Sequence, residues 1–206
     1  MRSREILLID AGTGNLHSVR NAFEHAGAQV KLTDRPEAIR QGGRLVLPGV
    51  GAFGKFMAGL RERDLGAALL ETAARGDPLL GICVGMQALL EVGEELGQFP
   101  GLGLLKGRVV RFPETPGLKV PHTGWNQLWP QRESGLLAGL KAGCYAYFNH
   151  SYYCAAADPG DCLAETEYGM RFASMVERGN LAGVQFHPEK SQRVGLRILE
   201  NFLYRS

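Results

Sequence analysis

The first half of the chain alternates short apolar runs with amphipathic segments. Residues 6–9 form a continuous apolar run, which is typical of a strand buried on both faces. Apolar positions then repeat at helical spacing as far as Ala26, and Gly27 is placed to end that helix. Further segments of strand character lie at residues 29–33, 45–47 and 78–83, and of helical character at residues 56–63 and 67–75. This alternation predicts an open, mostly parallel sheet with helices on both faces.

The second half of the chain has the pattern of short strands joined by tight turns. Strands are predicted at residues 109–112, 124–128, 145–153, 164–167, 172–176 and 182–186. Turns such as Asp158-Pro159-Gly160 separate them, which indicates antiparallel pairs. Apolar residues at helical spacing between Val194 and Leu203 predict a last amphipathic helix. We therefore predict a single α/β domain over residues 1–206, with an antiparallel extension to the mostly parallel sheet.

Composition narrows the classes of function. The 206 residues are 45% hydrophobic and 21% charged, which suits one globular domain. A net charge of +2, with the basic residues scattered, gives no strong field for nucleic acid or an anionic membrane surface. No apolar run is long enough to cross a bilayer. The four cysteines show no CxxC pair and suit a reduced compartment. We expect a cytoplasmic protein that binds neither nucleic acid nor membrane.

Cys83 lies in a pattern that suggests a nucleophile. Gly81-Ile82-Cys83-Val84-Gly85 follows a predicted buried strand and has the form of a nucleophile elbow, in which a sharp turn lifts the central side chain above the sheet. A Cβ at either glycine would crowd that turn. The thiol would lie at a helix N-terminus, where the helix dipole favours the thiolate. A small buried cysteine that merely ends a strand is the alternative interpretation.

His187, Pro188 and Glu189 follow another predicted buried strand. In an extended chain, residues two apart face the same way, about 6.6 Å from each other. Glu189 would then lie behind His187 and fix its tautomer. His187 would act as a base toward Cys83 and as an acid toward a leaving amine. An exposed turn with solvated side chains is the alternative, and it leaves the Cys83 pattern unexplained.

Residues 48–54 form a loop directly after a predicted strand, with glycines at positions 49, 51 and 54. Glycines leave the backbone free to adopt positive φ and to flip a peptide unit. A loop of this kind beside Cys83 would supply a second N–H group to an oxyanion hole, together with the amide of Val84. A plain connection from strand to helix is the alternative.

Together these segments resemble the class I, triad-type glutamine amidotransferases. Within that class the chain is similar to the glutaminase subunits of imidazole glycerol phosphate synthase, of histidine biosynthesis. The matching stretches span nearly the whole chain in order and are DAGTGNLHSV (10–19), PGVGAFG (48–54), GICVGMQ (81–87), HTGWNQL (122–128), YFNHSY (147–152) and QFHPEKS (185–191). The departures from the family pattern do not touch the three candidate catalytic residues. They are Ala11, Thr13, Val84 and Asn149.

The resemblance implies how the site works. Glutamine would be hydrolysed to glutamate and ammonia through a thioester on Cys83, assisted by His187 and Glu189. N–H groups from two segments would hold the oxyanion, and other residues would bind the amino-acid moiety of glutamine. The oxyanion residues are Val50, Gly51 and Val84, and the substrate-binding residues are Gln87, His150, Ser151 and Tyr152.

The resemblance also implies a partner. A cyclase subunit of the (βα)8 barrel type would form a heterodimer with this chain, receive the ammonia, and make imidazole glycerol phosphate and the aminoimidazole carboxamide ribotide. The residues expected at that interface are Trp125, Asn126, Tyr147 and Lys190. Aromatic side chains dominate interface hot spots, although ordinary core packing stays open for Tyr147. The free subunit is expected to be nearly idle, with the loop at residues 48–54 as the candidate switch.

Other classes of function fit the sequence less well. Gly12-Thr13-Gly14 follows the first strand, but His17 stands where a dinucleotide-binding motif needs its third glycine. PGVG, HTGWN and PEKS argue against another cysteine hydrolase or the glutaminase of a different complex. The presence of all three candidate catalytic residues argues against a non-catalytic subunit. The five histidines show no HExxH pattern, so we expect no metal and no cofactor.

Overall fold

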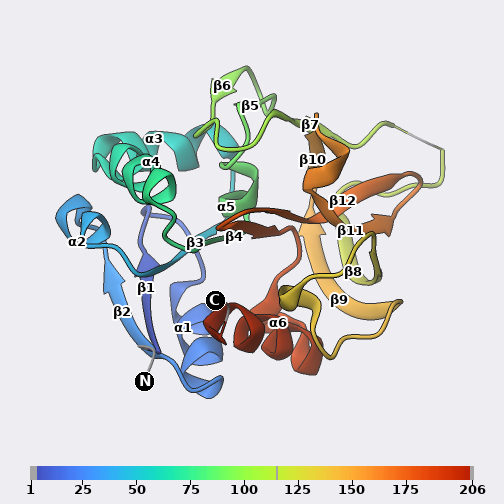
Figure 1. Ribbon diagram of the computed structural model, residues 1–206. Helices are drawn as coiled ribbons and strands as arrows, with labels where there is room; N and C mark the ends of the chain where they lie inside the picture. Colours follow the sequence, from blue (N-terminus) through green and yellow to red (C-terminus); the bar gives the residue numbers. More distant parts are fainter. Residues whose placement is uncertain (1–3, 115, 205–206) are drawn as a thin grey trace.

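Five parallel strands form one half of a large sheet (Figure 1). The computed structural model describes residues 4–114 and 116–204. The parallel strands lie in the order β2-β1-β3-β4-β13. Their bounds are β1 (Glu5–Ile9), β2 (Gln29–Thr33), β3 (Arg44–Gly49), β4 (Leu79–Cys83) and β13 (Leu181–Val184). The apolar runs predicted as buried strands therefore form the centre of the sheet.

Helices cover both faces of this parallel part. On one face, α1 (Leu16–His25) packs beside α6 (Gln192–Tyr204), and the rings of Phe23 and Phe202 meet edge to face at 6.5 Å. On the other face lie α2 (Pro36–Arg40), α3 (Phe53–Glu62) and α4 (Leu65–Arg75) (Figure 1). The strand order explains this division. The connection from β1 to β2 and the connections from β2 to β3 and from β3 to β4 run in opposite directions along the sheet, and right-handed crossovers in opposite directions place their helices on opposite faces.

An antiparallel extension continues the sheet beyond β13. Next to β13 lies β12 (Arg171–Arg178), followed by β10 (Tyr152–Ala156), β7 (Gly107–Arg111), β5 (Val92–Gly93) and β6 (Phe99–Pro100). A branch leaves β12 through β11 (Cys162–Glu167), β8 (His122–Pro130) and β9 (Cys144–His150). Short 3-10 turns lie at Gly135–Leu137, Pro159–Asp161 and Pro188–Lys190. The predicted fold class, a mostly parallel sheet with an antiparallel extension, is confirmed.

The prediction of one strand over residues 145–153 is wrong. The chain breaks at Ser151, so that β9 ends at His150 and β10 begins at Tyr152. The two strands pair with different neighbours, β9 with β8 and β10 with both β7 and β12. Hydrophobic pattern alone does not reveal such a break, because pairing partners distant in sequence decide it.

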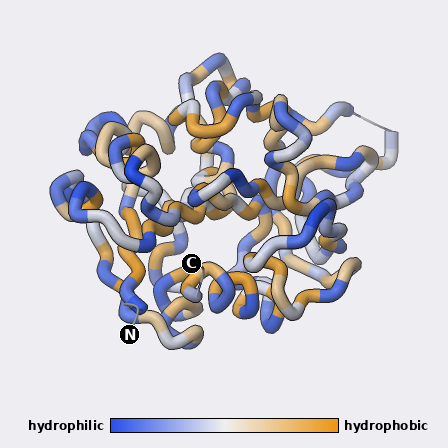
Figure 2. Tube along the Cα trace, in the orientation of Figure 1, coloured by the Kyte–Doolittle hydropathy of each residue, from blue (hydrophilic) through white to orange (hydrophobic). Residues whose placement is uncertain are grey.

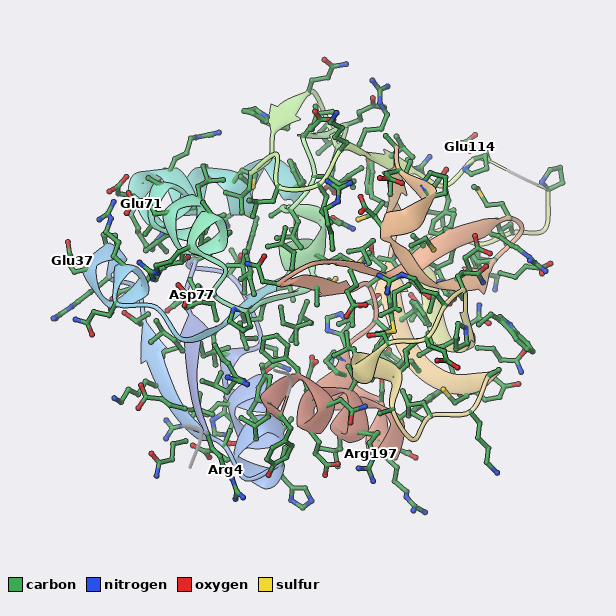
Figure 3. All side chains as sticks on the ribbon, viewed as in Figure 1. Arg4, Glu37, Glu71, Asp77, Glu114 and Arg197 are labelled. Atoms are coloured by element: carbon green, nitrogen blue, oxygen red, sulfur yellow. The ribbon has the colours of Figure 1, made fainter. Side chains whose placement is uncertain are left out.

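The core lies between the sheet and its helices. Figure 2 shows hydrophobic residues concentrated along the central strands. Phenylalanines fill much of the space, and Phe53, Phe56 and Phe186 are fully buried. Charged side chains such as Glu37, Glu114 and Arg197 lie at the outside of the molecule (Figure 3). Within residues 4–114 and 116–204, no helix combines the length and the apolar character needed to cross a membrane.

Candidate active site

The carboxyl ends of β3, β4 and β13 meet at one edge of the sheet. The parallel register pairs Gly49 with Cys83 and Ile82 with Val184. Cys83 therefore lies between the glycine loop that follows β3 and the segment that follows β13. Three segments far apart in the sequence converge at this point, and ligand sites in open α/β sheets are found at such carboxyl ends.

Cys83 has the backbone of a nucleophile elbow. Its φ of 55° and ψ of −112° lie in a region that residues other than glycine rarely adopt. The flanking glycines are required by space, as predicted. A Cβ on Gly85 would overlap the carbonyl oxygen of Leu47, and a Cβ on Gly81 would overlap the carbonyl oxygen of Gly85.

The helix after Cys83 is short. It is α5 (Val84–Gln87), a single turn of four residues. A macrodipole is the sum of many aligned peptide dipoles, so one turn contributes little to thiolate stability. Cys83 is the N-cap residue of this turn, as predicted, and an effect of the helix dipole on the sulfur stays a prediction, of small size for a single turn.

His187 and Glu189 form a buried pair. The Nδ1 atom of His187 lies 3.0 Å from Oε1 of Glu189, whose side chain is only 1% exposed. Because Nδ1 is engaged there, Nε2 is the nitrogen left for the hydrogen bond with Cys83. Burial alone would lower the pKa of His187, but hydrogen bonds and charge from Cys83 and Glu189 outweigh it and raise the pKa to about 10. The site thus favours an imidazolium next to the sulfur.

The predicted pairing of His187 with Glu189 is found, but it is achieved by another geometry. The segment 188–190 is a 3-10 turn and not an extended strand. Pro188 starts the turn with its fixed φ, and the turn brings Glu189 back under the His187 ring. The expectation that strand alternation places the two side chains is therefore corrected.

A pocket of about 300 Å³ opens above Cys83. Every residue predicted for the oxyanion hole or for glutamine binding lines it, as do Cys83 and His187. These predicted residues are Val50, Gly51, Val84, Gln87, His150, Ser151 and Tyr152. The volume is at the small end of ligand pockets and suits a molecule of the size of an amino acid.

Glu95 also lines the pocket and was missed by the sequence analysis. It accepts a hydrogen bond of 2.6 Å from the backbone N–H of Phe53, at the start of α3. Residues 94–98 lie between β5 and β6 and show neither strand nor helix periodicity. No local pattern could therefore have placed this carboxylate in the pocket that Cys83 lines.

The glycine loop after β3 has two glycines with different roles. Gly51 has a φ of 85° and open space around its Cα, so its backbone conformation is what requires glycine. Gly49 instead packs closely, since a Cβ there would lie 2.6 Å from the ring of Phe56 and 2.8 Å from the amide of Gly85. Of these two glycines only Gly51 has a positive φ in this structure, and the peptide flip in the loop stays a prediction.

The four predicted interface residues do not lie on one face. Trp125 is 47% exposed and pairs across β8 and β9 with Tyr147, which is half-buried. Their rings meet edge to face at 6.0 Å, and Nζ of Lys190 lies 5.8 Å from the Tyr147 ring centre. Asn126 points to the opposite face of β8 and donates to Nε2 of His122 and to a backbone carbonyl. Contact with a partner stays a prediction for all four.

Known proteins resemble this chain over nearly its whole length. The family model described as glutamine amidotransferase class-I matches residues 7–206. Imidazole glycerol phosphate synthase subunit HisH of Symbiobacterium thermophilum is 51% identical, over 96% of this chain and 92% of that protein. The subunit of the same name from Salinibacter ruber is also 51% identical, over 95% of this chain and 92% of that protein.

Solved structures show the same fold at lower identity. A structure described as a glutamine amidotransferase aligns with a TM-score of 0.74 at 21% identity, covering 95% of this chain and 98% of that chain. PurLQS from Thermotoga maritima aligns with a TM-score of 0.75 at 18% identity and covers 98% of both chains. The fold class predicted from the resemblance is therefore confirmed.

Proposed function

Because the chain belongs to the class I glutamine amidotransferases and, within them, to the family of imidazole glycerol phosphate synthase subunit HisH, we propose that it releases ammonia from glutamine for a cyclase subunit. The observation that carries the proposal is the strained elbow of Cys83, facing the buried pair of His187 and Glu189 at the base of a pocket of about 300 Å³. In this role the chain supplies the nitrogen that enters imidazole glycerol phosphate in histidine biosynthesis.

The reaction follows from the hydrogen-bond partners of His187. The thiol proton of Cys83 moves to Nε2 of His187, and the sulfur attacks the side-chain amide carbon of glutamine. His187 returns that proton to the leaving nitrogen, the carbon–nitrogen bond breaks, and ammonia and a γ-glutamyl thioester form. A water molecule, with His187 again as the base, then releases glutamate. Glu189 holds Nδ1 throughout and stabilises the imidazolium.

The developing negative charge on the amide oxygen needs N–H donors. The backbone N–H of Val84 follows the nucleophile directly, at the first position of α5. The loop at Val50 and Gly51 lines the same pocket and can present a second N–H. Both positions act through the backbone, so the departure of Val84 from the family's usual residue does not matter for this role.

Glutamine carries an ammonium and a carboxylate that the pocket has to recognise. Of the described residues that line the pocket, Glu95 provides a carboxylate for the ammonium group. Gln87 and the segment from His150 to Tyr152 offer amide and backbone groups for the rest of the amino-acid moiety. Lys190 lies at the same pocket and supplies a positive charge near its rim.

The proposed partner is a (βα)8-barrel cyclase that forms a heterodimer with this chain in the cytoplasm. The exposed face of β8 and β9 beside the pocket supports this, since Trp125 and Tyr145 both expose about half of their surface there. Large exposed apolar side chains suit a surface that a partner covers, and Lys190, which lines the pocket, lies 5.8 Å from the ring of Tyr147 on this face.

The proposal is tested by measuring ammonia release from glutamine by the purified chain with and without the cyclase subunit. The Cys83→Ala variant should release no ammonia, because it lacks the nucleophile, and should still bind the cyclase. Cys144→Ala serves as the matched control, since Cys144 is a free thiol on β9 that does not line the pocket, and it should retain activity. Glutamine-dependent activity in Cys83→Ala would rule out the proposed nucleophile.

A further inference from the structure

Two buried glutamine side chains connect the backbone of β10 to the nucleophile. Nε2 of Gln87 lies 3.0 Å from the carbonyl oxygen of Tyr152 and 3.1 Å from Oε1 of Gln185. Nε2 of Gln185 in turn lies 3.8 Å from Sγ of Cys83. Gln185 is fully buried and Gln87 is 3% exposed, so both side chains are held mainly by protein groups.

The direction of these hydrogen bonds has a single consistent assignment. The carbonyl oxygen of Tyr152 can only accept, so Gln87 presents its NH2 group to it. The same NH2 group faces Gln185, which must therefore present its oxygen to Gln87. The amide nitrogen of Gln185 is then left to face the Cys83 sulfur. The opposite orientation of Gln185 would set two NH2 groups against each other.

The carbonyl group of Tyr152, where this series of hydrogen bonds starts, is itself held in place. Nδ1 of His150 donates to the Tyr152 oxygen at 2.8 Å. Nε2 of His150 then accepts from Nδ1 of His122 at 3.0 Å, and Nε2 of His122 accepts from Nδ2 of Asn126 at 3.2 Å. The backbone N–H of Gln127 donates to Oδ1 of Asn126 at 2.8 Å, which fixes the orientation of that amide. Because Nε2 of each imidazole accepts a hydrogen bond while Nδ1 donates one, both rings have to be neutral for the complete series to form.

Resting on the function proposed above, we propose that Gln185 is a further catalytic residue, whose buried amide donates a hydrogen bond to the Cys83 thiolate. When the thiol proton passes to His187, the negative charge left on the sulfur is stabilised by the imidazolium on one side and by the Gln185 N–H on the other. Hydrogen bonds to charged groups are stronger than those between neutral groups, so this contact gains strength when the thiolate forms.

Gln87, His150 and His122 are positioning residues for this contact. They keep the Tyr152 carbonyl in place and thereby keep the Gln185 oxygen turned away from the sulfur. Burial lowers the pKa of His150 to about 3 and that of His122 to about 4, so both rings stay neutral at pH 7, as the chain of hydrogen bonds requires. The single turn of α5 adds little dipole at Cys83, so a hydrogen bond from a side chain adds to the stabilisation of the sulfur.

Two variants of Gln185 test whether this residue acts as a hydrogen-bond donor or only fills space. Gln185→Met fills a similar volume without a donor, and Gln185→Glu keeps the shape but sets a carboxylate oxygen against the sulfur. Ser174→Ala is the matched control, since Ser174 is also fully buried and its hydroxyl donates to the carbonyl of Ala164, away from Cys83. The full-length chains are treated with iodoacetamide at pH 7 and pH 10, and alkylation of Cys83 is followed by peptide mass spectrometry.

At pH 7 the alkylation rate of Cys83 should fall about tenfold in Gln185→Met and at least as much in Gln185→Glu, because only the thiolate reacts. At pH 10 the rates of these variants should approach the wild-type rate, and Ser174→Ala should match wild type at both pH values.

The inference is overturned if Gln185→Met and Gln185→Glu react at the wild-type rate at pH 7. It is also overturned if they react faster at both pH values, which would indicate an opened site. Alkylation needs no glutamine, so a failure of the proposed glutaminase activity would be seen separately in the ammonia assay.

Discussion

His122 and His150 stand directly opposite each other on β8 and β9, with Nδ1 of the first 3.0 Å from Nε2 of the second. Both side chains are buried, and His122 is stacked between the rings of Phe148 and Tyr168 at centroid distances of 4.7 and 4.0 Å. The hydrogen bonds that run from Asn126 through both rings to the Tyr152 carbonyl form together only if neither imidazole is protonated, because Nε2 of each ring has to accept.

This pair should make the protein sensitive to acid. Below the ordinary histidine pKa of 6.5 the unfolded chain takes up protons that the folded chain excludes, since the folded pKa is about 4 for His122 and about 3 for His150. The free energy of unfolding should therefore fall as pH decreases from 6.5, by about 2 kcal/mol per histidine at pH 5. Urea unfolding of the chain at pH 7 and pH 5 measures this loss.

His122→Phe should lose less stability between pH 7 and pH 5 than wild type, because phenylalanine preserves the ring stacking and has no proton to take up. His17→Phe is the control, since His17 is exposed on α1 and its variant should keep the wild-type pH response. Equal losses in His122→Phe and wild type would show that His122 does not contribute to the acid sensitivity.

Glu189→Gln should reduce kcat by about 10²- to 10⁴-fold with a small change in KM. A glutamine NH2 group can donate to Nδ1 of His187, which would force the ring proton onto Nε2 and face the wrong tautomer toward Cys83. Steady-state kinetics of ammonia release in the presence of the cyclase measure the effect. Glu167→Gln, an exposed carboxylate on β11, should leave kcat unchanged. A kcat in Glu189→Gln within twofold of wild type would remove Glu189 from the mechanism.

The pKa of His187 also affects stability at alkaline pH. Its folded pKa is raised to about 10, so the stabilisation from the His187 imidazolium is complete below pH 6.5 and is lost as pH rises through about 10. Removing the carboxylate in Glu189→Gln should shrink this alkaline loss. The same urea experiment, extended from pH 7 to pH 10, compares the variant with wild type.

The backbone of Cys83 should be strained in any variant that keeps a Cβ. Cys83→Gly should unfold at a higher temperature than Cys83→Ala, with a difference of about 1 kcal/mol in stability, because glycine adopts a φ of 55° without cost. Both variants lack the thiol, so the comparison isolates the backbone conformation. Thermal unfolding followed by circular dichroism provides the measurement, and a Cys83→Gly variant less stable than Cys83→Ala would show that the elbow carries no such strain.

Trp125→Ala should weaken association with the cyclase at least tenfold or uncouple ammonia release from cyclisation, as expected for an aromatic residue at the centre of an interface. Trp129→Ala is a matched control. Trp129 is 46% exposed and lies on the same face of β8, four residues farther along the strand. Isothermal titration with the cyclase gives both affinities. Unchanged binding and coupling in Trp125→Ala would exclude this face as the interface.

Sequence patterns predicted those features of the structure that depend on residues close together in the chain. The strand before Cys83 and the need for glycine at positions 81 and 85 follow from apolar runs and from the space around a sharp turn. The pairing of His187 with Glu189 was predicted correctly for an incorrect reason, since a 3-10 turn replaces the expected strand geometry. A proline after the histidine fits both geometries, and the sequence does not choose between them.

The remaining features depend on contacts between distant residues. Gln87 and Gln185 are 98 positions apart, and Gln87 and Tyr152 are 65 apart, so no sequence window contains the hydrogen bonds that join them. The break at Ser151 depends on which strands pair with β9 and β10, and the place of Glu95 depends on the packing of α3. These features become visible only when the whole sheet is assembled.

The position of β13 has a consequence for the order of events during synthesis. This strand follows all other strands along the chain, yet it lies between β4 and β12 in the middle of the sheet. A chain still on the ribosome therefore has to leave a gap beside β4 until residues 181–184 emerge. Cys83 is made more than a hundred residues before His187, and during that interval it has neither its base nor the amide of Gln185. On the mechanism proposed above, a growing chain is therefore unable to consume glutamine until its last strand closes the sheet.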